Sequence, residues 1–294
     1  MRFFSAALGL IAAAPMLHPQ VLVFSREQMV QYTAKNPYER FADGRPKVPD
    51  ALIEKVRDLA AEDVFGALGA AYPNQYEGGF RLLHPGRKLA GRAVTAQFMP
   101  ARADVMDVAE AEAKSKGFGR NANQRVIDML QPGDVVVVDL GGKIERGTFV
   151  GDNLATAIHT ATRTGGMVID GAIRDLEGIF ELPMAAYFRG VHPSAIGNVM
   201  LTGVNIPIRI GNATVMPGDV VFGDREGVYF IPPHMVEQVV TRADTTKIHD
   251  EWTKAKFKTG RYKSSELYPS PSDPALKREY DEYLKKKLAE KKRP

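Results

Sequence analysis

The chain has 294 residues, no cysteine and a formal net charge of +4 at pH 7. The missing thiols exclude disulfides, thiolate nucleophiles and Cys-ligated metal sites. The positive charge is concentrated at the end, because residues 275–294 hold eight Lys and Arg against four Asp and Glu, which leaves 31 of each sign elsewhere. With 44% hydrophobic residues, the chain can form a substantial core in one main domain with extensions.

The N-terminus has the pattern of an export signal. Arg2 precedes an apolar run, Phe3–Leu17, which at 15 residues is short for a membrane span of about 20. We therefore expect a signal peptide over residues 1–24, an exported (periplasmic or secreted) protein and no stable membrane span. The alternative is a hydrophobic N-terminal helix that packs on the domain of a cytoplasmic protein. Residues 25–49 follow, and we expect them to be irregular.

The main domain is expected over residues 50–240. Asp50 is predicted to cap a helix over residues 51–60, whose apolar side chains share one face. An alternating segment at 91–98 predicts a strand, and an Ala- and Glu-rich segment at 104–116 predicts a helix.

The middle of the chain has the pattern of a strand–helix–strand unit. The apolar, β-branched run 134–139 predicts a buried strand, apolar residues recur at helical spacing over 152–163, and 167–169 predicts a second buried strand. This length is typical of a parallel crossover, and ligands of parallel sheets bind beyond the carboxyl ends of the strands. The segments that follow the two strands, Gly151–Ala155 and Arg174–Asp175, are therefore the candidate site.

These two segments carry complementary chemistry. The helix that begins at Asp152 presents free N–H groups and a positive dipole end, which suit a carboxylate or a phosphate. Arg174 can bind a carboxylate through two hydrogen bonds, and Asp175 can hold a hard divalent cation through oxygen. Together they predict a site for a 2-oxo acid. The plainer interpretation of Arg174 and Asp175 is a surface ion pair or a helix cap.

The later part of the chain is rich in strands and ends in helices. Short strands are predicted at 199–201, 206–210, 219–222 and 227–231. An extension over residues 241–294 is expected to contain the end of a helix over 234–258, a Pro- and Ser-rich linker, and a basic helix over 275–292. The basic helix could contact an acidic surface or lipid, but we favour a solvated helix or one that packs on a neighbouring subunit. Its interleaved acidic residues argue against nucleic-acid binding.

Other catalytic chemistry has little support in the sequence. The six histidines form no zinc-binding pattern, and no phosphate-binding glycine loop is present. His192 is expected to be a turn histidine bonded to the backbone.

Four segments occur in the order seen in the RraA-like family, which the chain resembles over residues 52–240. The segments are Gly151–Ala155, Val168–Asp175, Val204–Ile208 and Pro217–Pro232. The family contains the 4-hydroxy-4-methyl-2-oxoglutarate aldolases, some with oxaloacetate decarboxylase activity, and the regulator of ribonuclease E activity. Its members are often labelled demethylmenaquinone methyltransferases. The resemblance implies an α/β protein with a three-layer β/β/α swivelling-domain fold.

The resemblance also implies roles for residues of this chain. The turn would bind the pyruvyl carboxylate through backbone amides, and Asp175 would ligate Mg²⁺, with Mn²⁺ as a second possibility. The implied substrate-binding residues are Gly151, Asp152, Asn153, Leu154, Ala155 and Arg174. Family members commonly have Glu-Leu-Leu where this chain has Asp152–Leu154. Where they often have Ser-Asp-Ala-Leu-Gly, this chain has Phe65–Gly69 and lacks the aspartate.

The sequence therefore predicts a divalent-metal-dependent lyase, a class II pyruvate aldolase or 2-oxo acid decarboxylase. It would cleave a C–C bond next to the pyruvyl unit of a small 2-oxo acid through a metal-stabilised enolate. Arg174 and Asp152 are the candidate catalytic residues, and a metal-bound water is the alternative to Asp152 as base. A homotrimer or hexamer is implied by the resemblance. The alternative function is a non-catalytic regulator that binds a protein partner, which a signal peptide would disfavour, since ribonuclease E works inside the cell.

Overall fold

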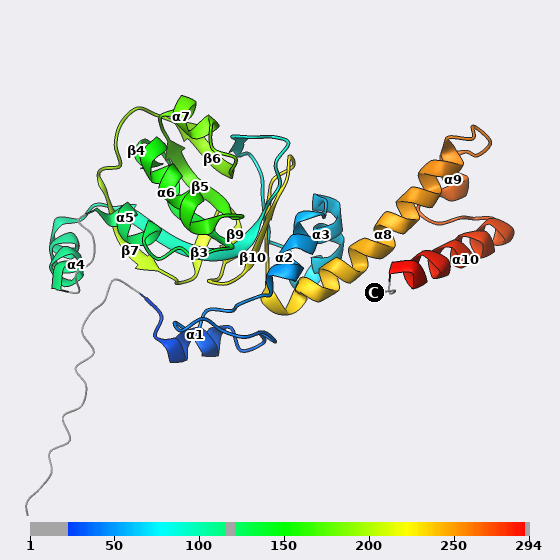
Figure 1. The fold of residues 1–294 in the computed structure, drawn as a ribbon, viewed down its shortest axis with the longest axis horizontal. Coiled ribbons are helices and arrows are strands. Elements are labelled where there is room, and N and C mark those ends of the chain that lie inside the picture. The colour runs from blue at the N-terminus through cyan, green and yellow to red at the C-terminus, as the bar shows by residue number, and fades with distance from the viewer. Residues whose placement is uncertain (1–22, 116–120, 292–294) are drawn as a thin grey trace, which may run out of the picture.

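The computed structural model describes residues 23–115 and 121–291 (Figure 1). The apolar run Phe3–Leu17 lies outside the described residues, so the signal peptide stays a prediction. Within the described ranges, none of the helices has the length and apolar character needed to cross a membrane.

One large sheet organises the main domain. Its strands run in the order β1-β11-β10-β3-β4-β5-β6-β2, and β7 also pairs with β3. The central strands β3 (Leu89–Pro100), β4 (Asp134–Val150), β5 (Gly166–Ile173) and β6 (Ala185–Val191) are parallel neighbours, so their carboxyl ends share one edge. The other strands of this sheet are β1 (Tyr76–Glu77), β2 (Arg81–Leu82), β7 (Val199–Val204), β10 (Val220–Gly223) and β11 (Val228–Ile231).

The two faces of the central strands pack against different elements. Val136 and Val138 of β4 belong to one buried cluster with Ile158, which lies on α6. Val135 and Val137 point to the opposite face and pack in a second cluster with Ile208, since successive residues of a strand alternate between faces. The first face carries α5 (Ala122–Ile127), α6 (Asp152–Thr162) and α7 (Leu176–Phe180), and the second carries the small sheet β8 (Ile208–Ile210) and β9 (Ala213–Val215).

A third cluster lies beside β10 and β11 and connects the domain to its C-terminal extension. It joins α2 (Asp50–Arg57), α3 (Ala61–Leu68) and the start of α8 (Val236–Phe257). The far end of α8 packs instead with α9 (Ser264–Leu267) and α10 (Pro274–Lys291), and together they form an arm that projects from the body (Figure 1). The remaining elements are α1 (Arg26–Tyr32), α4 (Ala103–Ser115), and the short 3-10 helices η1 (Gly69–Ala71) and η2 (Pro233–Met235).

The predicted mixed α/β fold is confirmed, with a central sheet and helices. The predicted strand–helix–strand unit is present as β4, α6 and β5, although β4 continues through several register shifts to Val150. The finer assignment to a swivelling-domain fold stays a prediction, as do the domain boundaries.

The helix expected over residues 51–60 is wrong in its ends. α2 begins at Asp50, not after it, because the carbonyl of Pro49 accepts from the N–H groups of the first turn. The helix stops at Arg57, and α3 starts at Ala61, where the Asp63 carboxylate accepts from the Ala60 N–H at 2.9 Å. This acceptor favours a new helix over continuation of the old one.

Residues 25–49, which we expected to be irregular, contain the helix α1. Its start is fixed by Ser25 and Gln28, each of whose side chains bonds to the backbone N–H of the other, at 3.2 and 2.9 Å. This reciprocal cap supplies partners for two N–H groups that a short helix would otherwise leave free.

Candidate functional site

The two segments singled out in the sequence meet beyond the carboxyl ends of β4 and β5. β4 ends at Val150, and its carbonyl accepts from the Arg174 N–H at 3.1 Å, directly after β5. Gly151 is the N-cap residue of α6, and Asp175 is the N-cap residue of α7. The parallel register of the strands therefore brings together two segments that are about 20 residues apart in the sequence.

Gly151 allows the side chains of Arg174 and Asp175 to lie against the backbone of the turn. A Cβ at Gly151 would lie 2.3 Å from Asp175 Oδ2 and 3.0 Å from Arg174 Nε. Any side chain here would force both functional groups to move.

Arg174 and Asp175 also form an ion pair, so the plainer interpretation of the two residues describes a real contact. Arg174 Nε lies 3.3 Å from Asp175 Oδ2, and the side chains are 39% and 46% exposed, which leaves both open to a ligand. Asp175 has a left-handed backbone, with φ 56° and ψ 46°. That conformation is uncommon outside glycine and is enriched at functional sites.

The predicted carboxylate-binding turn offers two free backbone donors. The Asn153 N–H donates to Asp152 Oδ1 at 2.7 Å, and the Ala155 N–H donates to the Gly151 carbonyl at 2.9 Å. The N–H groups of Asp152 and Leu154 have no acceptor within the part of the chain that the structure describes. These two amides are thus the donors that a bound anion could use.

A cavity of about 330 Å³ opens beside this turn. Of the residues predicted for the site, Gly151, Leu154 and Arg174 line it. Asn153 is exposed, Ala155 is buried, and Asp152 lies against α7, since a Cβ at Gly178 would be 2.8 Å from Asp152 Cβ. The sequence analysis missed the other lining residues, which are Glu110, Asn121, Ala122, Asn123, Thr148, Phe149, Val150, Ala195 and Ile196.

Asn123 and Thr148 support the wall of the cavity. The buried Asn123 amide donates to the Phe149 carbonyl at 2.8 Å, and the Thr148 hydroxyl donates to the His192 carbonyl at 3.2 Å. His192 itself is a turn residue, as predicted, because its Nδ1 accepts from the Ser194 N–H at 3.2 Å. It is not among the residues that line the cavity.

The donor set at this turn suits a weakly held, water-rich cation. Within the described residues, three or more His, Cys, Asp or Glu side chains nowhere gather closely enough to hold a metal by themselves. Asp175 supplies one accessible carboxylate. Mg²⁺ is commonly bound by one or two carboxylates with waters and substrate oxygens as the remaining ligands, so this single residue fits Mg²⁺ and does not fit a closed structural metal site.

The fold and the site together define a mixed α/β protein whose arginine, carboxylate and free amides meet beyond the ends of parallel strands. The model of the RraA-like family, described as Aldolase/RraA, matches residues 56–230. This chain belongs to the RraA-like family.

Curated relatives match only part of their length. Protein DlpA of Legionella pneumophila is 29% identical over 215 residues, which are 71% of this chain and 32% of that protein. A protein of Halalkalibacterium halodurans named "Putative 4-hydroxy-4-methyl-2-oxoglutarate aldolase" is 32% identical over 120 residues, which are 41% of this chain and 56% of the relative. The match thus spans about a third of the Legionella protein and about half of the Halalkalibacterium protein.

Two solved structures share the fold. RraAS2 of Streptomyces coelicolor, described as an unusual member of the RNase ES inhibitor RraA protein family, is 26% identical with a TM-score of 0.59, and the match covers 74% of this chain and all of that one. A protein of Pseudomonas syringae superposes with a TM-score of 0.58 at 22% identity, over 73% of this chain and 96% of that one, a likeness of fold alone.

Proposed function

We propose that this protein is a divalent-metal-dependent lyase that cleaves a C–C bond adjacent to the pyruvyl unit of a small 2-oxo acid. The observation that carries the proposal is the convergence of Arg174 and Asp175 on Gly151 beyond β4 and β5, where Gly151 and Arg174 line the cavity and Asp175 contacts them both from outside its lining. The name of the Halalkalibacterium halodurans relative supports the lyase class. Aldol cleavage of a 4-hydroxy-4-methyl-2-oxoglutarate-type substrate and decarboxylation of oxaloacetate are the two reactions we propose.

The pyruvyl carboxylate would be held by side chain and backbone together. The Arg174 guanidinium can form two parallel hydrogen bonds to a carboxylate, and the free N–H groups of Asp152 and Leu154 lie at the start of α6, where the helix dipole favours negative charge. A volume of about 330 Å³ is at the lower end of ligand pockets, which fits a small acid.

Asp175 would hold Mg²⁺ or Mn²⁺, with water completing the coordination. A divalent cation there supplies Lewis-acid stabilisation for the negative charge that develops on the pyruvyl unit. Arg174, whose Nε lies 3.3 Å from the same carboxylate, would orient Asp175 and keep its terminal N–H donors for the substrate.

The proposed cleavage needs one proton acceptor. In the retro-aldol direction, a base removes the proton of the substrate hydroxyl and the carbon that carries this oxygen becomes a carbonyl. The electron pair of the broken C–C bond moves into the pyruvyl unit, and protonation of the resulting enolate gives pyruvate. We place Asp152 as the candidate base of this chain. Its Oδ1 already accepts from the Asn153 N–H at 2.7 Å, which fixes the carboxylate at the start of the helix.

One assay tests the proposal. Pyruvate release from 4-hydroxy-4-methyl-2-oxoglutarate and from oxaloacetate is expected with Mg²⁺ and is expected to stop with a chelator. The Asp175→Asn variant should lose metal binding in calorimetry and lose activity while it stays folded. Asp104→Asn is the matched control. Asp104 forms an exposed ion pair with Arg102, with a distance of 2.8 Å between Nε and Oδ1, and does not line the cavity. A folded protein that releases no pyruvate from either substrate would leave the non-catalytic regulator as the function.

The proposal extends to assembly and location. We propose a homotrimer or hexamer, which sedimentation equilibrium tests, and export directed by Phe3–Leu17. Replacing Leu10 by Arg interrupts the apolar run and should retain the full-length protein in the cytoplasm. N-terminal sequencing of native protein that finds an intact Met1 in the cytoplasm would contradict export.

A further inference from the structure

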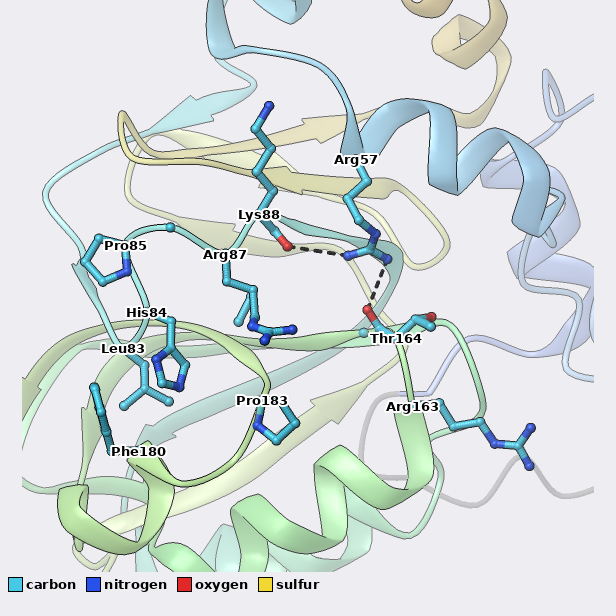
Figure 2. Close-up of a pocket in the computed structure, with 13 residues that line it drawn as sticks. Arg57, Leu83, His84, Pro85, Arg87, Lys88, Arg163, Thr164, Phe180 and Pro183 are labelled. Atoms are coloured by element: carbon cyan, nitrogen blue, oxygen red, sulfur yellow. Dashed lines mark hydrogen bonds between the residues drawn. The ribbon is translucent and has the colours of Figure 1, made fainter.

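A second and larger cavity lies at the amino ends of the parallel strands β5 and β6, and Figure 2 shows the residues that line it. Its volume is about 770 Å³, and Gly165 and Ala185, where β5 and β6 begin, form part of its wall. This cavity shares no lining residue with the first, and at the start of β5 it is about 25 Å from Arg174, because β5 runs from Gly166 to Ile173 and a strand rises about 3.3 Å per residue. It is therefore a separate site and not an extension of the first.

The lining of this cavity is basic. Four cationic side chains contribute to it and no Asp or Glu does, and the cations are Arg57, Arg87, Lys88 and Arg163. A concave surface that carries one sign of charge concentrates ligands of the opposite sign.

Two of the four cations are already engaged in holding the wall together. Arg57 donates to the Ala90 carbonyl at 3.0 Å and to the Thr164 carbonyl at 3.1 Å, the second of which Figure 2 shows, and its Nε contacts the Glu54 carboxylate at 3.1 Å. The Lys88 ammonium donates to the Leu59 carbonyl. These contacts fix the shape of the cavity and leave little capacity for a ligand.

Arg87 and Arg163 are available to a ligand. Neither side chain has a hydrogen-bond or ion-pair partner within residues 23–115 and 121–291. The Arg87 N–H donates to the His84 carbonyl at 2.9 Å, which closes a turn with Pro85 in its second position and fixes the base of the Arg87 side chain. In Figure 2, Arg87 reaches toward the middle of the cavity, whereas Arg163 lies at its outer side.

An apolar surface faces these cations. Phe180 is 55% exposed, and its ring centroid lies 4.7 Å from that of His84, on the same side of the cavity (Figure 2). The His84 Nε2 contacts the Leu182 carbonyl at 3.0 Å and so carries the proton, since a carbonyl can only accept. Pro183 and the buried Leu83 complete an apolar surface of the kind that lines ligand pockets.

We propose that this cavity binds an organic anion with a planar apolar body. Its carboxylate or phosphate group would pair with Arg87, with Arg163 at the rim, and its body would lie against Phe180 and His84. The cavity volume is within the range of pockets that take drug-sized ligands, and an arginine that is not committed to any other partner can give a full bidentate fork to either head group. This proposal is independent of the lyase activity.

Calorimetric titration of the full chain tests the site. The protein carries Arg174→Gln, so that an anion cannot be held at the other end of the sheet. The probes are phenyl phosphate and benzoate, which distinguish the two head groups, with inorganic phosphate and benzyl alcohol as the two halves of the ligand. We expect phenyl phosphate or benzoate to bind about tenfold more tightly than inorganic phosphate or benzyl alcohol. The aromatic anions combine the free energy of charge-assisted hydrogen bonds with that of apolar contact.

Variants assign the binding to the residues of the cavity. Arg87→Gln should weaken the aromatic anion about tenfold, the loss expected for one charge-assisted pair. Phe180→Ala should reduce the difference in affinity between the aromatic anion and inorganic phosphate. Arg278→Gln is the matched control, since Arg278 is an exposed arginine on α10.

Three results would overturn the site. They are the absence of binding by both aromatic anions, equal losses in Arg87→Gln and Arg278→Gln, and binding seen in the parent protein that Arg174→Gln abolishes. The last result would assign the anion to the carboxyl end of the strands. Circular dichroism of each variant verifies that a loss of binding does not reflect unfolding.

Discussion

The two ends of β5 present two different ways to attract an anion. At the carboxyl end, one arginine and two free backbone amides converge on a glycine, beside a cavity of about 330 Å³. At the amino end, four cationic side chains and no acidic one line a cavity of about 770 Å³. The smaller site has a carboxylate that could hold a cation, so the end at which we propose the chemistry is not the end with the larger cavity.

The difference predicts how each end tolerates substitution. Backbone donors cannot be removed by changing a side chain, but they can be blocked by adding one, so the carboxyl end should be sensitive at Gly151. The amino end depends on side chains and should be sensitive at its arginines.

The largest effect is expected from Gly151→Val. Its Cβ would lie 2.3 Å from Asp175 Oδ2, so both functional side chains must shift, and pyruvate release should fall by about 100-fold or more, the cost of an ångström-scale misplacement. Gly86→Ala at the amino end is the control, because a Cβ there meets nothing within 4 Å. Steady-state kinetics of the two variants measure the contrast, and full activity in Gly151→Val would refute the close contact as a functional requirement.

The next effect concerns Arg174→Lys, which keeps the charge and loses the planar fork. Binding of pyruvate and of oxalate should weaken by about 1–3 kcal/mol, the scale of a charge-assisted hydrogen bond. Oxalate should also inhibit the parent protein better than acetate, because oxalate, like a 2-oxo acid, can form a five-membered chelate ring with a cation and acetate cannot. Calorimetry and inhibition assays test both statements, with Arg102→Lys as the control for an exposed arginine in an ion pair. Equal inhibition by oxalate and acetate would contradict a chelated 2-oxo acid.

A smaller effect, on stability alone, is expected from Arg57→Lys at the amino end. The lysine cannot reach the carbonyls of Ala90 and Thr164 together, so the free energy of unfolding should fall by about 1–2 kcal/mol for the lost hydrogen bonds. Urea denaturation measures the change, and Arg278→Lys should show none. Pyruvate release by the folded variant should be unchanged, and a matching loss of activity would show that the two ends are coupled.

The smallest expected effect is a pH dependence of stability that comes from Asp219, a residue that lines neither cavity. Burial raises the pKa of Asp219 to about 7, although its Oδ2 accepts from the Met216 N–H at 2.8 Å. The native state therefore keeps a proton that the unfolded chain has lost above its ordinary pKa of 3.8, so stability decreases as pH rises from about 4 and levels off above about 7. Between pH 5 and 6 the decrease should be about 1 kcal/mol, and Asp219→Asn should remove it in urea titrations at the two pH values. An unchanged slope in that variant would assign the pH dependence to another group.

The carboxyl-end turn could be predicted from the sequence because its parts are nearly contiguous. The β-branched run of β4 and the helical spacing of α6 predict a parallel unit, and that unit alone brings Gly151 near Arg174. The rest of the cavity comes from distant segments. Glu110 on α4 and Asn123 on α5 reach it only through tertiary packing, which no local pattern encodes.

The amino-end cavity could not be predicted for the same reason. Arg57, Arg87 and Arg163 belong to three segments that the sheet topology brings together, and each by itself has the pattern of an ordinary surface residue. The helix α1 was missed for a different reason. The segment is too short to show an apolar helical period, and the only signal in the sequence was the reciprocal cap of Ser25 and Gln28.

The continuous helix α8 has a practical consequence for spectroscopy. Its first turn packs in the body through Val236 and Val239, but Trp252 packs in the arm with Leu267 and Tyr280. Trp252 is the only tryptophan of the chain, so intrinsic fluorescence reports the melting of the arm, whereas far-ultraviolet circular dichroism is dominated by the body. Two denaturation curves that fail to coincide would then indicate an arm that unfolds independently and not an intermediate of the sheet.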